Sequence, residues 1–291
     1  MHNQIVINTI IAASSYILVG ISFYITFSVA KFFHFTYGAF FTLGAYITYS
    51  LVNITGIHFI VSTVLAIILL SLIAMCMDQF VFRMIRNSTE GGYILLLASL
   101  GLYLVIQNAI SNIYGDSALL ILDTNHKAIF NILGGRITLT QVLQIALAVT
   151  MLLVTWFLIR HTPLGRYMRA VGYDKNLSLS LGIPIEKYIS LSFAIGYGIA
   201  AIAGVVAAMN VDITPTMGMR PMMMGMVVMI IGGNSILGIA CCACLIAAAQ
   251  HFGMIWLSTQ WQDAIAFIIL VVFLFFKPEG FFGKKSEKSF V

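Results

Sequence analysis

Residues 188–211 read YISLSFAIGYGIAAIAGVVAAMNV and contain no Asp, Glu, Lys or Arg. A helix of this length can cross the hydrocarbon core of a bilayer, which requires about 20 apolar residues. Gly196, Ala200, Gly204 and Ala208 recur every four residues, so they lie along one face of that helix. Small residues at this spacing allow two membrane helices to pack closely. The stretch therefore predicts a membrane-spanning helix with close helical neighbours.

Six other stretches lack the same four charged residue types. They are residues 5–30, 32–77, 91–115, 137–159, 221–262 and 264–276. The first is longer than the apolar core of a signal peptide and has no basic residues before it, so we interpret it as an uncleaved first helix. Residues 32–77 and 221–262 are too long for one span and too short for two with a comfortable loop. We predict an all-α polytopic membrane protein, one transmembrane domain over residues 1–291, with about eight to ten segments, some broken or re-entrant.

The composition supports a membrane protein. Hydrophobic residues make up 60% of the chain, charged residues only 9%, and the mean hydropathy is +1.01. A soluble domain carries about 25% charged residues, because its surface faces water. The net charge of +5 does not indicate a nucleic-acid partner, because the basic residues form short clusters between apolar stretches. That arrangement is typical of membrane topology.

The basic clusters predict an orientation. They are Arg83 with Arg86, residues 160–187, and residues 277–288. Loops rich in Lys and Arg stay in the cytoplasm. An even number of segments separates the first cluster from the second and the second from the third, so all three share one side. We therefore expect a cytoplasmic C-terminus, while the side of the N-terminus stays open, because residues 36–52 fit either a full span or a re-entrant half-helix.

Glycines interrupt the two longest apolar stretches. Tyr37-Gly38 and Gly44 lie in the first of them, and Gly232-Gly233 lies in the second. Unwound backbone at membrane depth is tolerated only beside protein or a water-filled cavity, and glycine-broken segments in both halves of a chain mark transport pathways. The alternative is that these glycines only permit close helix packing. The pattern alone is compatible with both.

Residues that could carry chemistry are scarce. Within the apolar stretches the ionisable side chains, cysteines apart, are His34, His58 and His251, and proton relays or voltage sensors need more than isolated histidines. No hydrolase or zinc-protease motif is present, so we expect no enzyme. No G-x-x-x-x-G-K-[ST] phosphate loop occurs either, so any ATP must bind to another chain.

A metal centre is not expected. The only dense group of soft ligands is Cys241, Cys242 and Cys244, and no His, Asp or Glu lies within four residues of them. Cysteine in an apolar stretch behaves as a small hydrophobic residue. We therefore predict no metal and no cofactor.

One basic loop differs from the others. Residues 160–187 read RHTPLGRYMRAVGYDKNLSLSLGIPIEK. Pro163 suits the first turn of a short helix, and residues 176–181 predict a second short turn that Gly182 and Pro184 end. A short helix parallel to the membrane could dock a soluble partner. The alternative is a loop that only sets topology and contacts lipid headgroups.

The loop resembles the coupling region of permease subunits of branched-chain amino-acid ABC importers, a family that includes urea and short-chain amide permeases. The matching residues are Ile159-Arg160, Gly165-Arg166, Arg169-Ala170, Asp174, Leu181-Gly182-Ile183 and Ala203-Gly204-Val205. In that family the region looks like a coupling loop that fits a cleft of the ATPase subunit. The resemblance implies that residues 160–187 form such a loop, with these coupling residues: Gly165, Arg166, Arg169, Ala170 and Gly182.

The resemblance covers nearly the whole chain. Further matching blocks are Phe40 with Leu43-Gly44-Ala45-Tyr46, Ile213, Pro215 and Gly218, Gly232-Gly233, Leu257-Ser258-Thr259 with Asp263, and Pro278, Gly280 and Gly283. It implies a translocation pathway along Tyr37, Gly38, Gly44, Pro215, Gly218, Gly232 and Gly233. The chain departs from the family's pattern at two places. Tyr37-Gly38-Ala39 replaces a His-Gly-Glu-like triplet, and Met224 replaces a common lysine.

The implied assembly contains two permease chains (identical or different), two cytoplasmic ABC ATPases and an extracytoplasmic solute-binding protein. It would lie in the bacterial cytoplasmic (inner) membrane and move branched-chain amino acids, or small solutes such as urea and amides, into the cell. The competing interpretation is an ATP-independent channel or facilitator for a small neutral solute. The loop at residues 160–187 discriminates between the two, because a channel would not need it.

Overall fold

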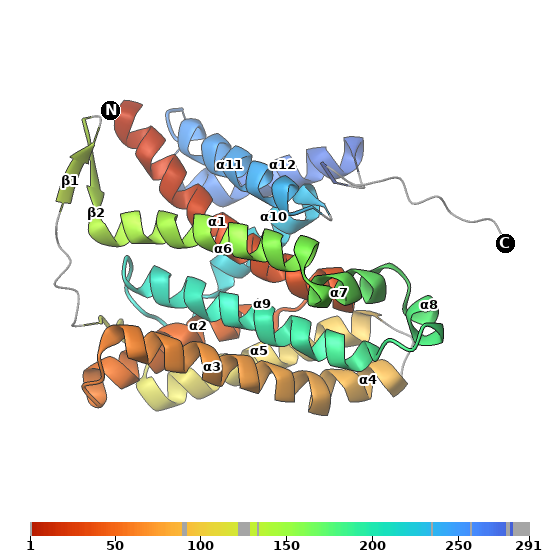
Figure 1. Cartoon of the computed structure of the whole chain (residues 1–291). Helices are drawn as coiled ribbons and strands as arrows, with labels where there is room; N and C mark the ends of the chain where they lie inside the picture. Colours follow the sequence, from red (N-terminus) through yellow and green to blue (C-terminus); the bar gives the residue numbers. More distant parts are fainter. Residues whose placement is uncertain are drawn as a thin grey trace.

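The computed structural model describes residues 2–88, 92–121, 129–132, 134–233, 235–256, 258–277 and 280–281. Over these residues the chain is a bundle of helices with one short β-hairpin (Figure 1). The predicted all-α polytopic class is confirmed.

The helices and strands follow one another along the chain with short connections. In order they are α1 (His2–Ala30), α2 (Thr36–Tyr49) with the π-helical turn η1 (Ser50–Ile54), α3 (Phe59–Met77) with the π-helical turn η2 (Asp78–Phe82), α4 (Arg83–Ser88), α5 (Gly92–Tyr114), β1 (Ile129–Ile132), β2 (Gly135–Thr138), α6 (Leu139–His161), α7 (Pro163–Tyr173), α8 (Lys175–Ser180), α9 (Ile185–Ala208), α10 (Met219–Gly232), α11 (Ile236–Gly253), the 3₁₀ turn η3 (Thr259–Trp261) and α12 (Gln262–Phe276).

Seven helices of the described chain are long and apolar enough to cross a membrane: Asn3–Ala30, Phe59–Arg86, Gly92–Tyr114, Leu139–His161, Ile185–Ala208, Ile236–Gly253 and Thr259–Phe276. Helices α2 and α10 are shorter, with 14 residues each. Each of the two overlong apolar stretches thus folds into one short and one long helix: α2 with α3, and α10 with α11. This arrangement is compatible with the predicted eight to ten segments.

Helix α9 lies at the centre of the bundle and packs against α1, α2 and α3. In an apolar 18-residue stretch of α9, 78% of the residues are buried, against 22% in α3, α5 and α6. The small-residue face explains this position. A Cβ atom added to Gly204 would overlap the carbonyl oxygen of Phe41 on α2, and one added to Gly196 would lie 2.6 Å from the Thr26 side chain on α1. The predicted close packing is confirmed.

The elements sort to two ends of the bundle (Figure 1). Helices α4, α7 and α8 gather at one end, which we call the α8 end, and the last residues of α12 lie there too. The β-hairpin and the start of α1 lie at the opposite end, which we call the hairpin end. The three basic clusters therefore begin on the same side of the bundle, as the even segment count predicts.

Candidate functional site

The basic loop folds as two short helices. Helix α7 begins at Pro163, and the Thr162 side chain accepts a hydrogen bond of 3.1 Å from the Gly165 N–H. Asp174 caps α8 and accepts hydrogen bonds of 2.8 and 3.0 Å from the first free N–H groups of that helix. Gly182, with φ of +74°, follows the last turn. The predicted start of α7 is confirmed, and the predicted second turn is α8.

Helix α7 is held against the membrane bundle by its inner face. Met168 and Val171 are buried there. A Cβ atom on Gly165 would overlap backbone carbonyls of Leu158 and Ile159 on α6, and one on Gly172 would overlap the carbonyl oxygen of Ser28 on α1. Gly165 and Gly172 thus let α7 fold back across the ends of α6 and α1.

The outer face of α7 and α8 is exposed and partly apolar. Arg166 and Arg169 point outward from α7, and Ala170 is half-buried. Tyr173 is 90% exposed, and three leucines of the α8 region are also exposed: Leu177, Leu179 and Leu181. We call Arg166, Arg169, Tyr173, Leu177 and Leu181 the docking tip.

Large apolar side chains that are exposed together on a surface mark sites where a protein or a membrane binds. The sequence interpretation named the arginines and missed the apolar half. The alternating segment LSLSLG at residues 177–182 contains these leucines and could have indicated the apolar half.

Charged side chains surround the base of the docking tip. Burial lowers the pKa of the Lys175 ammonium from its ordinary value, nearby Arg86 lowers it further, and Glu186 raises it. Glu186 lies in the first turn of α9, where the helix dipole favours an acidic side chain. The loop thus joins α9 close to Lys175, Arg86 and Glu186, two cations and one anion.

Two of the expected pathway glycines touch each other. A Cβ atom on Gly218 would overlap the carbonyl oxygen of Gly38, and one on Gly38 would lie 3.1 Å from the Tyr103 ring. The Gly218 N–H donates a 3.1 Å hydrogen bond to the Thr42 hydroxyl. Tyr37 is buried beside this contact, with its ring centroid 4.3 Å from that of Phe23. The structure therefore brings α2 and the start of α10 together at backbone distance.

The other expected pathway residues lie apart from that contact. Gly44 lies inside continuous α2, where a Cβ atom would be 2.7 Å from the Ala201 carbonyl oxygen on α9, so it serves helix packing. Pro215 is buried in the loop before α10. Gly232 is the last residue of α10, and Gly233 is its C-cap residue, with φ of +66°. Gly218 and Gly233 thus cap the two ends of α10.

Methionines of α10 face aromatic residues of α1 and α2. Met222 and Met229 are buried in one cluster with Phe23, Tyr37 and Phe41. Met224, which replaces the lysine common in the resembled family, is buried near Gln250. Flexible thioethers fill irregular gaps against aromatic rings. These buried methionines therefore fill the core of the helical bundle.

No group of three or more His, Cys, Asp or Glu side chains within reach of one metal ion occurs among the described residues.

The bundle, with seven helices of the described residues long and apolar enough to span a membrane, defines a polytopic membrane protein. The chain belongs to the family described as the permease component of the branched-chain amino acid transport system, which it matches over residues 5–274.

It is 27% identical to the high-affinity branched-chain amino acid transport system permease protein LivH of Salmonella typhimurium, with 98% of this chain and 97% of LivH covered. It is also 27% identical to the corresponding protein BraD of Pseudomonas aeruginosa, with the same coverage. A shorter match, 36% identity over 32% of this chain and 26% of the relative, links it to the fructose import permease protein FruF of Bifidobacterium longum. No solved structure matches the chain.

Proposed function

We propose that this chain is the membrane-spanning permease subunit of an ABC importer. It moves a branched-chain amino acid or a similar small neutral solute into the cell, while separate ATPase subunits supply the energy. Family membership supports the transport role, and the names of LivH and BraD indicate the class of solute.

The observation that carries the ATPase part of the proposal is the docking tip. Two arginines and three large apolar side chains are presented on short helices outside the spans, at the end where the basic clusters lie. Interfaces that bind tightly combine buried apolar anchors with arginine. Gly165 contributes indirectly, because it positions α7, and Gly182 contributes the turn that leads back to α9.

The remaining parts of the assembly follow from the two ends of the bundle. With the α8 end in the cytoplasm, the hairpin end faces outward. A solute-binding protein would dock there, near residues 212–220 and the loop at residues 116–136, of which 122–128 and 133 lie outside the described residues. A second permease chain would complete the pathway, and the Gly38–Gly218 contact would be its closed section within this chain. Nucleotide binding to the ATPase subunits would then shift the populations of the inward-facing and outward-facing states of the pathway.

The test is a charge placed in the docking tip. Leu177→Glu should reduce recovery of the ATPase in a pull-down by about tenfold or more, because a charge left buried and unpaired in an interface costs about 2 kcal/mol or more and about 1.4 kcal/mol is tenfold in affinity. Solute uptake into proteoliposomes that contain the ATPase and the binding protein should fall with it. Leu120→Glu, an exposed leucine at the hairpin end, is the matched control and should keep ATPase recovery.

Wild-type recovery of the ATPase by Leu177→Glu would remove the docking assignment. Accumulation of solute against a gradient in vesicles that contain only this chain would replace the ABC importer by an ATP-independent carrier. Downhill flux alone in such vesicles would indicate the channel alternative.

A further inference from the structure

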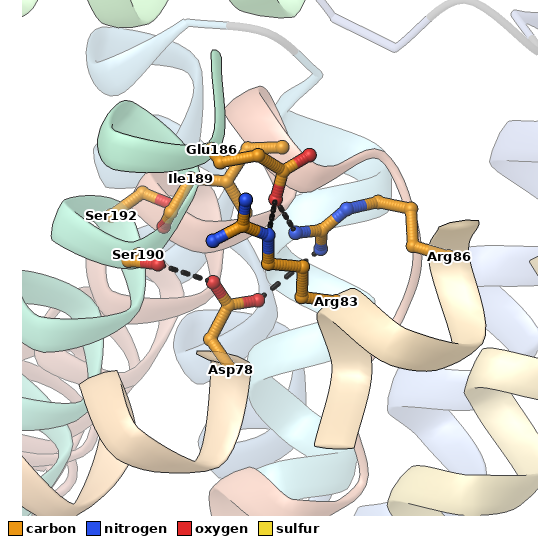
Figure 2. A network of polar contacts seen from close by, with 7 residues as sticks. All are labelled: Asp78, Arg83, Arg86, Glu186, Ile189, Ser190 and Ser192. Atoms are coloured by element: carbon orange, nitrogen blue, oxygen red, sulfur yellow. Dashed lines mark hydrogen bonds and ion pairs between the residues drawn. The ribbon is translucent and has the colours of Figure 1, made fainter. Parts of the chain in front are cut away.

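Arg86 bridges two acidic side chains that lie far apart in the sequence (Figure 2). Its Nη1 donates a 3.2 Å hydrogen bond to Asp78 Oδ1, and its Nη2 donates a short hydrogen bond to Glu186 Oε2. The Ser190 hydroxyl donates a 2.6 Å hydrogen bond to the other Asp78 oxygen. The planar guanidinium can hold two carboxylates at once, which a lysine ammonium does less well.

The two halves of this bridge differ in exposure. The Asp78 side chain is 0% exposed, that of Arg86 is 11% exposed and that of Glu186 is 32% exposed. A buried carboxylate that loses its partner is strongly destabilised, so the Asp78–Arg86 half should stay closed. Water reaches the Glu186 half, where separated charges can be solvated. The buried Asp78–Arg86 pair should therefore stay closed, while the partly exposed Arg86–Glu186 pair can open.

The bridge joins elements of different kinds. Glu186 lies in the first turn of α9, four residues after Gly182, so it follows directly on the loop that carries the docking tip. Asp78 begins the π-helical turn η2 at the end of α3, and Arg86 lies in the short helix α4, which follows η2 directly. π-Helical turns inside helices occur often at functional sites. Arg86 thus links the first turn of α9 to the end of α3.

A continuous row of aromatic rings leads from the bridge to the glycine contact. Phe82 of η2 lies 5.5 Å from Phe193 of α9, measured between ring centroids, and Phe193 stacks on Tyr197 at 5.6 Å. The Tyr197 ring lies 6.4 Å from that of Tyr37, the neighbour of Gly38. Rows of packed side chains can carry energetic coupling between two sites, and a measurement of that coupling is the test of such a route.

We propose that Arg86 is a positioning residue that couples the docking tip to the pathway. The Glu186–Arg86 contact opens and closes as the ATPase moves the loop, while Asp78 holds the Arg86 side chain at the end of α3. Helix α9 then shifts against α2 near Gly38 and Gly218. This inference rests on the proposed function, because it requires an ATPase at the docking tip.

The experiment compares three variants in the full complex with ATPase and binding protein in proteoliposomes. Glu186→Gln removes the outer charge, and Arg86→Lys keeps a cation without the fork. Arg83→Gln is the matched control: Arg83 lies on the same helix and its Nε is 3.7 Å from the same Glu186 oxygen, but the structure shows it in no contact with Asp78, and its side chain is 49% exposed. Two quantities are measured, namely ATPase recovery in a pull-down and the amount of solute transported per ATP hydrolysed.

We expect Glu186→Gln and Arg86→Lys to recover the ATPase as the wild type does. Their ratio of solute to ATP should fall by about 5-fold or more, the lower end of typical coupling between two sites. Arg83→Gln should keep the wild-type ratio. If Arg86→Lys does not fold, Glu186→Gln alone decides, because its side chain is partly exposed.

A wild-type ratio in Glu186→Gln would overturn the inference and leave the proposed function in place. Loss of ATPase recovery in Glu186→Gln would also overturn it, because the bridge would then only shape the docking tip. Failure of the proposed function looks different, since the wild-type complex itself would then recover no ATPase.

Discussion

Replacing Gly204 by alanine should loosen the contact between α9 and α2. The added methyl carbon would overlap the Phe41 carbonyl oxygen and lie 2.8 Å from the carbonyl carbon. Carbon atoms pack at about 3.5–4.0 Å, and both obstacles are backbone atoms, so a rotamer change cannot relieve the overlap. The two helices must separate by on the order of 1 Å. Overpacking of this kind costs about 1–3 kcal/mol.

The measurement is thermal unfolding of the detergent-solubilised chain, followed by size-exclusion chromatography after heating. A loss of about 1–3 kcal/mol should lower the midpoint by roughly 2–12 °C, at about 2–4 °C per kcal/mol. Gly101→Ala is the matched control, because Gly101 lies inside α5 and a Cβ atom there meets nothing within 4 Å. Alanine is the better helix former, so this control should be neutral or stabilising by about 0.5–1 kcal/mol.

An unchanged midpoint in Gly204→Ala, with the control also unchanged, would refute the reasoning. It would mean that α2 and α9 do not approach at backbone distance. The same result would weaken the proposed route from α9 to Gly38, because a shift of α9 against α2 reaches Gly38 only if the two helices are in close contact.

Three further predictions can be checked separately. Gly165→Leu should reduce the yield of folded protein, and not ATPase binding alone, because a side chain there would overlap the backbone of α6; normal yield on size-exclusion chromatography would contradict this. In intact cells and on a cysteine-free background, Lys175→Cys should resist an impermeant maleimide and Asp116→Cys should react, since the two lie at opposite ends of the bundle; labelling of Lys175→Cys from outside would reverse the orientation. The purified chain alone should show no ATP hydrolysis above a protein-free blank, because it contains no phosphate loop; turnover that survives repeated purification would contradict the proposal.

The class of the molecule and much of its local structure could be predicted from the sequence. Low charge and long apolar stretches required a lipid-covered helical bundle. The start of α7 at Pro163 and the turn at Gly182 could be predicted because capping and turn formation depend on neighbouring residues. The small-residue face of α9 predicted a closely packed helix, since its spacing is a property of one helix alone. The order of matching blocks predicted the family.

The contacts between residues far apart in the sequence could not be predicted and came from the three-dimensional structure. Residue spacing does not show that Gly38 contacts Gly218, or that Gly165 faces α6 while Leu177 faces outward. Arg86 looked like one member of a topology cluster, yet it joins Asp78 to Glu186 across 108 residues of chain (186 − 78). The physical reason is that a membrane helix carries little information about its rotation or its partner. Lipid accepts any apolar face, so the contacts between backbones and the few buried charges select the arrangement.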